Sequence, residues 1–198
     1  TGVFGVDRLG NVECHKEATD ASDFLKAKEY TEFRSRLIQR GTFAVGHNRA
    51  ATRGAVVDKN AHPFWVDDKV VLVQNGTYKG SHKELKDTEV DSEAIAHVLV
   101  EDEDIETALK KVNAAYALVW YDTRTKTLNL IRNDERPLWM AKTDNNALVW
   151  CSEPGFLYLA ASRNNINLED KPEMVPPERL VQLKLNGKNW DREDKELS

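Results

Sequence analysis

The feature that most constrains the fold is a succession of short apolar runs, rich in β-branched and aromatic residues, separated by polar turns. Between residues 114 and 152 four such runs follow one another: "AYALVWYD", "TLNLIRND", "PLWMAK" and "ALVWCS". Short apolar runs bounded by turn residues are typical of strands, and strands joined by tight turns pair antiparallel. This part of the chain is therefore expected to form antiparallel sheet.

Helices are expected between and around the strands. Residues 20–40 have capping residues followed by apolar residues at helical spacing, interrupted once. Further predicted helices are residues 91–100, 105–112 and 153–161, and further predicted strands are residues 1–7, 12–17, 42–48, 68–76 and 178–188. Runs of strands around a helical middle predict an α+β fold, with antiparallel sheets covered by helices.

The length and net charge of the chain limit the classes of protein to which it can belong. The 198 residues suit one domain, predicted here as residues 1–188 followed by a loose charged tail at 189–198. A net charge of −5 argues against nucleic acid or an anionic membrane as partner, and no apolar run reaches membrane-spanning length. Cys14 and Cys151 have no metal-site spacing, so we expect ordinary reduced or buried thiols, no metal site and a cytoplasmic location.

Three stretches carry polar residues at predicted strand ends or helix starts. "GHNRAATRG" contains Arg49 and Thr52, "VLVQNG" ends in Asn75 and Gly76, and "VDSEAIAH" contains Asp91. An arginine can hold a carboxylate by two hydrogen bonds, and an aspartate can pair with an ammonium. An asparagine beside a glycine N–H can form an oxyanion hole. Each stretch also has an ordinary interpretation, as a solvated arginine, a turn or a helix cap.

The order and spacing of these stretches resemble a known family. "GHNRAATRG", "NAHPF", "VQNGTYKGSHKEL", "VDSEAIAHVL", "AAYALVWYD", "RNDERPLWM" and "CSEP" are similar, in that order, to motifs of the glutaminase domain of class II glutamine amidotransferases. This is the N-terminal nucleophile family of glucosamine-6-phosphate synthase and phosphoribosylpyrophosphate amidotransferase. The resemblance runs from the first residue to about residue 185. It implies a four-layer αββα sandwich of two antiparallel sheets.

The resemblance also implies roles for individual residues. Arg49 and Asp91 match the pair that holds the α-carboxylate and α-ammonium of glutamine, and Thr52 matches a pocket threonine. Asn75 and Gly76 match the oxyanion-hole pair. The implied reaction is hydrolysis of the glutamine side-chain amide to glutamate and ammonia, without a metal or an organic cofactor. The implied partners are glutamine or a related small amide and a separate acceptor or synthase subunit.

Several positions depart from the family pattern. Ala50 stands where the family has a bulky aromatic residue, Arg53 replaces a small residue or histidine, and Gln74 replaces the histidine of H-N-G. These departures favour a retained glutamine pocket with altered coupling to an acceptor. His62, in "NAHPF", is expected to be structural.

The sequence allows two alignments of its first residues, and they differ in the nucleophile that they imply. The family uses an N-terminal cysteine, in a C-G-I-x-G strand, whose own α-amine is the base. "TGVFG" fits that motif with Thr1 in place of cysteine, but it fits a later motif, R-G-x-D-[SA]-[SA]-G, with better spacing to "GHNRAATRG". The second alignment is favoured, and it expects about thirty further residues upstream, including the nucleophilic cysteine. The alternatives are an N-terminal-threonine amidohydrolase or self-processing peptidase that uses Thr1, and a non-catalytic binding or assembly module on the same fold.

Overall fold

The computed structural model describes residues 1–50, 54–80, 88–102, 104–186 and 189–197. Its largest sheet has six strands in the order β12-β11-β7-β6-β5-β4, and every neighbouring pair is antiparallel. The strands are β4 (Phe64–Val66), β5 (Val70–Tyr78), β6 (Ala114–Asp122), β7 (Thr127–Arg132), β11 (Arg179–Asn186) and β12 (Asn189–Glu196).

Two three-stranded antiparallel sheets complete the strand content of the described residues. One has the order β2-β1-β3, and the other has the order β10-β8-β9. Their strands are β1 (Gly2–Asp7), β2 (Val12–Lys16), β3 (Gly41–His47), β8 (Trp139–Lys142), β9 (Leu148–Cys151) and β10 (Glu173–Met174). The helices are α1 (Ala21–Phe24), α2 (Lys28–Arg40), α3 (Asp91–Glu101), α4 (Ile105–Lys110) and α5 (Pro154–Arg163), with a 3-10 turn η1 (Asp58–Asn60).

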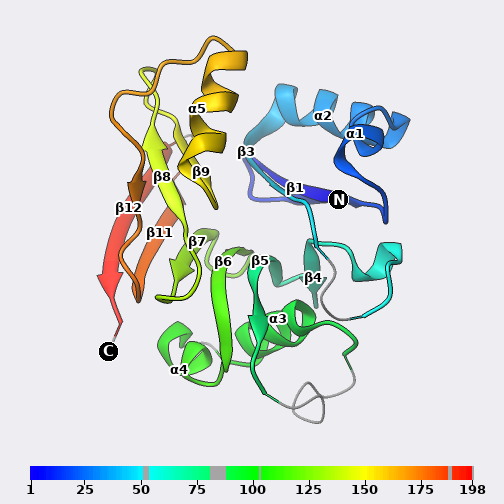
Figure 1. Cartoon of the computed structure of the whole chain (residues 1–198), viewed down its shortest axis with the longest axis vertical. Coiled ribbons are helices and arrows are strands. Elements are labelled where there is room, and N and C mark those ends of the chain that lie inside the picture. The colour runs from blue at the N-terminus through cyan, green and yellow to red at the C-terminus, as the bar shows by residue number, and fades with distance from the viewer. Residues whose placement is uncertain (51–53, 81–87, 103, 187–188, 198) are drawn as a thin grey trace.

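The elements pack as four layers (Figure 1). Side chains alternate between the faces of a strand, so β5 buries Leu72 against α3 and α4 on one face. On its other face, Val71 joins a core that also contains Phe4 of β1 and Met140 of β8. Both three-stranded sheets thus pack on the same face of the six-stranded sheet. Their outer faces are covered by α1 and α2, through Phe33 and its neighbours, and by α5. The structure confirms the α+β sandwich with antiparallel sheets, and it divides the second sheet into two parts.

The structure corrects three local predictions. "NG" does not end a strand, because β5 continues through Asn75 and Gly76, which pair with β6. Neither Asp91 nor Ser92 caps α3: the N-cap is Val90, and Asp91 is the first helical residue. The segment expected to be a loose tail contains β12, which pairs with β11 along its length and packs Trp190 against the core. Pairing with a neighbouring strand outweighs the local turn signal at Asn75 and Gly76 and the charge signal of β12.

Among the described residues, no helix combines the length and apolar character that crossing a membrane requires.

Candidate functional site

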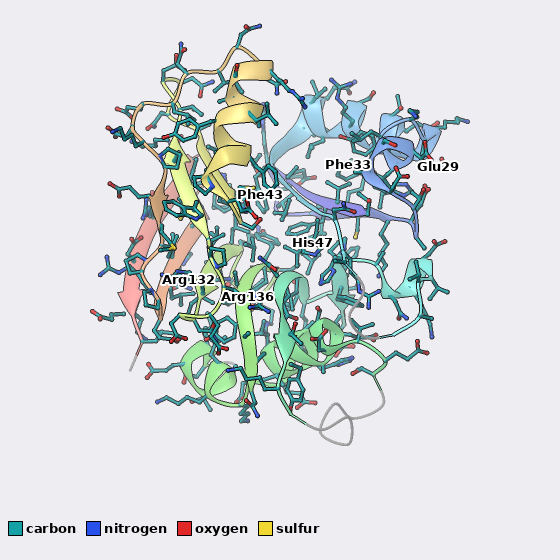
Figure 2. All side chains as sticks on the ribbon, viewed as in Figure 1. Glu29, Phe33, Phe43, His47, Arg132 and Arg136 are labelled. Carbon is teal, nitrogen blue, oxygen red and sulfur yellow. The ribbon has the colours of Figure 1, made fainter. Side chains whose placement is uncertain are left out.

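A cavity of about 850 Å³ lies between the six-stranded sheet and the two three-stranded sheets. Arg49, Asn75, Gly76 and Asp91 all line it, although they come from three separate stretches of sequence. Thr52, the fifth residue predicted for this site, lies outside the described residues. The structure therefore brings together the four motif residues that lie within its described part. Figure 2 labels three further lining residues, Phe43, His47 and Arg136, near the centre of the molecule.

Strand β5 supplies the amide groups of the site. Asn75 shares its face of β5 with Val73, because side chains two residues apart point the same way, and this face looks toward the cavity. The Asn75 side chain is exposed there. The next residue, Gly76, approaches β6 so closely that an added Cβ would lie 2.0 Å from the carbonyl oxygen of Ala115. Glycine at this position allows β5 to stay paired beside Asn75.

The close approach at Gly76 gives a stability prediction. Gly76→Ala is expected to lower the free energy of unfolding by about 1–3 kcal/mol, because β5 and β6 must separate to admit the methyl group. The melting temperature of a chain of this size should then fall by roughly 2–4 °C per kcal/mol. Gly155→Ala is the matched control, since no atom lies within 4 Å of a Cβ added there. Equal thermal melts for the two variants would contradict the packing argument.

Asp91 is a buried carboxylate at the start of α3. The residue is 5 % exposed, and its two side-chain oxygens accept hydrogen bonds from the backbone N–H groups of Tyr78, at 2.9 Å, and Ser92, at 3.0 Å. The positive end of the helix dipole favours a negative charge in the first turn. Asp91 therefore joins the end of β5 to α3 and presents a fixed negative charge at the wall of the cavity.

Two histidine rings pack against each other, tilted by 50°, near the start of α3. The ring centroids of His47 and His62 are 4.1 Å apart, and Nε2 of His62 lies 2.9 Å from the hydroxyl oxygen of Ser92. Burial, with neighbouring positive charges that include Arg49, lowers the pKa of His47 to about 4 and the pKa of His62 well below its ordinary value. Both rings are therefore neutral at pH 7, and they add no positive charge to the site.

The loop that carries His62 is fixed by a lysine. The Lys16 ammonium donates to the carbonyl oxygens of Lys59, Ala61 and Pro63 at 3.0, 3.0 and 3.1 Å. These three bonds hold "NAHPF" against β2 and position His62 at the wall of the cavity. The expectation that His62 is structural agrees with its buried hydrogen bond to Ser92.

The two histidines predict that stability depends on pH. Their pKa values in the folded chain lie below the unfolded value of about 6.5, so the unfolded chain binds more protons in this range. Their contribution is fully present above pH about 6.5 and is lost as the pH falls toward 4. The free energy of unfolding, measured by urea denaturation at pH 7, 6 and 5, should fall by up to about 1.4 kcal/mol per pH unit for each ring. A double variant, His47→Gln with His62→Gln, that kept the parent slope would contradict this assignment.

The hydroxyl group of Thr1 is engaged by main-chain and side-chain oxygens of two other residues. Its hydroxyl oxygen lies 2.9 Å from the carbonyl oxygen of Thr19 and 2.9 Å from Oδ1 of Asn48. Thr1 is not among the described residues that line the cavity, whereas Asn48 is.

Comparison with known proteins decides the family. Residues 47–158, more than half of the chain, match the family described as "Glutamine amidotransferase domain". The chain belongs to this family. The match contains Arg49, Asn75, Gly76 and Asp91, and it extends through β9 into α5.

Individual relatives agree with the family assignment. This glutamine amidotransferase domain is 37 % identical over 159 residues to a glutamine–fructose-6-phosphate aminotransferase (isomerizing) of Thermus thermophilus, covering 72 % of the chain and 23 % of the relative. It is 35 % identical over 112 residues to the Rhizobium meliloti protein of the same description, covering 47 % of the chain and 18 % of the relative. The chain thus spans about a quarter of the length of the curated relatives, or less.

Solved structures share the fold at low sequence identity. Glutamine phosphoribosylpyrophosphate amidotransferase from B. subtilis, complexed with ADP and GMP, superposes with a TM-score of 0.70 at 19 % identity. The match covers 97 % of this amidotransferase domain and 42 % of that chain. At this identity the likeness supports the fold, and it extends over nearly all of the 198 residues.

Some residues of the site were not assigned a role from the sequence. Three such residues line the cavity of the amidotransferase domain: Arg136, which precedes β8, Trp150 in β9 and Phe156 in α5. Arg136 lies in the recognised stretch "RNDERPLWM", which was a signal for it, whereas nothing local distinguished Trp150 or Phe156 from core residues. Gln74 is 3 % exposed, and no described residue hydrogen-bonds its side-chain amide.

Proposed function

We propose that this domain binds glutamine in the cavity and hydrolyses its side-chain amide to glutamate and ammonia. The observation that carries the proposal is that Arg49, Asn75, Gly76 and Asp91 line one cavity in a chain of the glutamine amidotransferase family. The groups offer one positive charge, one negative charge and two amides. This set complements a free amino acid that carries an amide side chain.

Substrate binding is assigned to the two charged residues. Asp91 pairs with the α-ammonium of glutamine, because two backbone hydrogen bonds at the start of α3 fix its buried carboxylate at the wall of the cavity. Arg49 binds the α-carboxylate through its planar guanidinium group. Because His47 and His62 stay neutral, they do not compete with the ammonium for Asp91.

The proposed reaction is an acyl transfer. A nucleophile attacks the amide carbon of glutamine, and the carbonyl oxygen becomes an oxyanion that the Asn75 side-chain amide and the Gly76 N–H stabilise. The C–N bond then breaks and ammonia leaves with a proton. Water attacks the acyl intermediate, releases glutamate and restores the nucleophile. The ammonia acceptor belongs to another domain or subunit, as the relatives' names suggest for fructose 6-phosphate.

The attacking group is proposed to be an N-terminal cysteine rather than Thr1. The Thr1 hydroxyl is held by Thr19 and Asn48, and Thr1 is not among the described residues that line the cavity. A threonine hydrolase that uses Thr1 is therefore the weaker candidate. A non-catalytic binding module is favoured by one observation, the replacement of an aromatic residue by Ala50 at the wall of the cavity.

Ligand specificity tests the binding proposal without requiring turnover. In a titration followed by NMR, L-glutamine should shift the signals of Asn75, Gly76 and Asp91. Glutaramate, which lacks the α-ammonium, should bind at least about tenfold more weakly, because it leaves the Asp91 charge unpaired. Equal affinity for the two compounds, or shifts confined to other parts of the chain, would overturn the assignment of Asp91.

A further inference from the structure

The buried side-chain atoms that lack a hydrogen-bond partner gather at one wall of the cavity. Within the described residues these atoms are Nδ1 of His62 and both amide atoms, Oε1 and Nε2, of Gln74. Both residues are 3 % exposed, and both line the cavity. A buried polar group without a partner costs free energy, and most such groups in folded proteins are paired. These atoms therefore indicate a ligand that supplies the missing partners.

The same sheet offers a comparison in Gln182 of β11. Nε2 of Gln182 donates a hydrogen bond of 2.7 Å to Oδ1 of Asn129 on the neighbouring strand β7. Gln74 stands opposite Leu118 on β6, which has no polar side chain to offer. On the other side of Gln74, β4 pairs with β5 only as far as Leu72. A glutamine side chain is thus satisfied within the sheet at one position and left open at the other.

The side chain of Gln74 leans along β5 toward Asp91. Side chains two residues apart lie on the same face of a strand, so Gln74, Gly76 and Tyr78 share one face. Nε2 of Gln74 lies 2.8 Å from the position that a Cβ at Gly76 would occupy. The glycine therefore leaves room for the amide on the side of Tyr78, whose backbone N–H donates to Oδ2 of Asp91.

The spacing along β5 suits one ammonium group between the amide and the carboxylate. Gly76 and Tyr78 are two strand residues apart, which is roughly 7 Å. An ammonium that donates to an oxygen atom on each side spans about 6 Å. No described residue holds the amide of Gln74 in one orientation, so a ligand can turn Oε1 toward itself. Gln74 and Asp91 can therefore accept from the same ammonium.

We propose that Oε1 of Gln74 accepts a hydrogen bond from the α-ammonium of glutamine, beside Asp91. An ammonium has three N–H donors that point in different directions, so one carboxylate leaves at least one of them open. The neutral amide supplies this acceptor without adding a second charge. Gln74 thereby contributes to the selection of a free amino acid over an amide that lacks the α-ammonium. This inference rests on the proposed function, because it assigns a further residue to the same substrate.

The variant Gln74→Met tests the assignment, because methionine is also unbranched but has no amide. In titrations followed by NMR, the variant should bind L-glutamine about tenfold more weakly than the parent chain, since a hydrogen bond to a charged group is lost. γ-Aminobutyramide, which keeps the ammonium and lacks the carboxylate, should be weakened by a similar factor. Glutaramate, which lacks the ammonium, should bind equally to both chains.

The three ligands separate the outcomes. Equal losses for L-glutamine and glutaramate would indicate a general change of the cavity and would overturn the inference. Losses for these two ligands with none for γ-aminobutyramide would place Gln74 at the carboxylate and would also overturn it. Unchanged binding of L-glutamine by the variant would remove Gln74 from the site and leave the proposed function standing. A parent chain that bound none of the three ligands would contradict the proposed function itself, and the inference with it.

Thermal melts of the ligand-free chain give an independent reading. Gln74→Met should raise the melting temperature by roughly 2–4 °C, because it removes a buried amide that has no partner. Gln182→Met is the matched control. It should lower the melting temperature, since it leaves Oδ1 of the fully buried Asn129 without its donor, and it should not change ligand binding. A lower melting temperature for Gln74→Met would show that the amide is already satisfied in the free chain and would overturn the inference.

Discussion

Asp91→Asn is expected to weaken glutamine binding by about a hundredfold or more. Removing one partner of a buried charge pair costs about 2–5 kcal/mol, and the substituted amide leaves the α-ammonium of glutamine without a counter-charge. The asparagine oxygen can still accept one of the hydrogen bonds from the Tyr78 and Ser92 N–H groups, so the fold should persist. Isothermal titration with L-glutamine measures the loss, and a thermal melt checks the fold.

The control for this variant removes a charge elsewhere. Asp170→Asn changes an exposed carboxylate that is not among the residues lining the cavity, and it should leave glutamine binding unchanged. Asp91→Glu, which keeps the charge but displaces it, should bind with intermediate affinity. Parent affinity in a folded Asp91→Asn chain would show that the α-ammonium is held elsewhere.

Asn75→Ala is expected to reduce the rate of glutamine hydrolysis by ~10²–10³ once a nucleophile is in place, because it removes one oxyanion donor. The form to assay is the chain extended by an upstream segment that begins with a free cysteine. The loss should fall on kcat, since the side chain of Asn75 is assigned to the oxyanion rather than to the charged ends of glutamine. A variant that raised KM with kcat unchanged would instead place Asn75 in substrate binding.

The layers of the fold and the residues around the cavity could be predicted from the sequence. Strand runs joined by polar turns predicted antiparallel sheets, and the motif stretches predicted four residues that the structure places around one cavity. This worked because strand exits and helix starts are places where side chains from distant stretches can converge. Arg49 follows β3 and Asp91 opens α3, both at such positions.

The incorrect predictions lie where pairing with a neighbouring strand outweighs the local preference of the sequence for a turn or a loose tail. Asn75 and Gly76 form a common turn signal, yet the neighbouring strand β6 extends far enough to pair with both. The segment after residue 188 has the charge of a solvated tail, yet β11 offers it a free edge and Trp190 gives it an apolar contact. The division of the second sheet at β3 and β9 left no local trace in the sequence, because both strands look like ordinary buried strands.

Ammonia release from L-glutamine is the measurement that tests the central claim most directly. The account predicts that the chain extended by a segment with a free N-terminal cysteine releases ammonia and glutamate in equal amounts, and that replacing this cysteine by alanine abolishes release. It also predicts that the 198-residue chain releases none, because the Thr1 hydroxyl is held by Thr19 and Asn48. Turnover by the 198-residue chain that Thr1→Ala abolishes, or no turnover by the cysteine-bearing chain, would contradict the account.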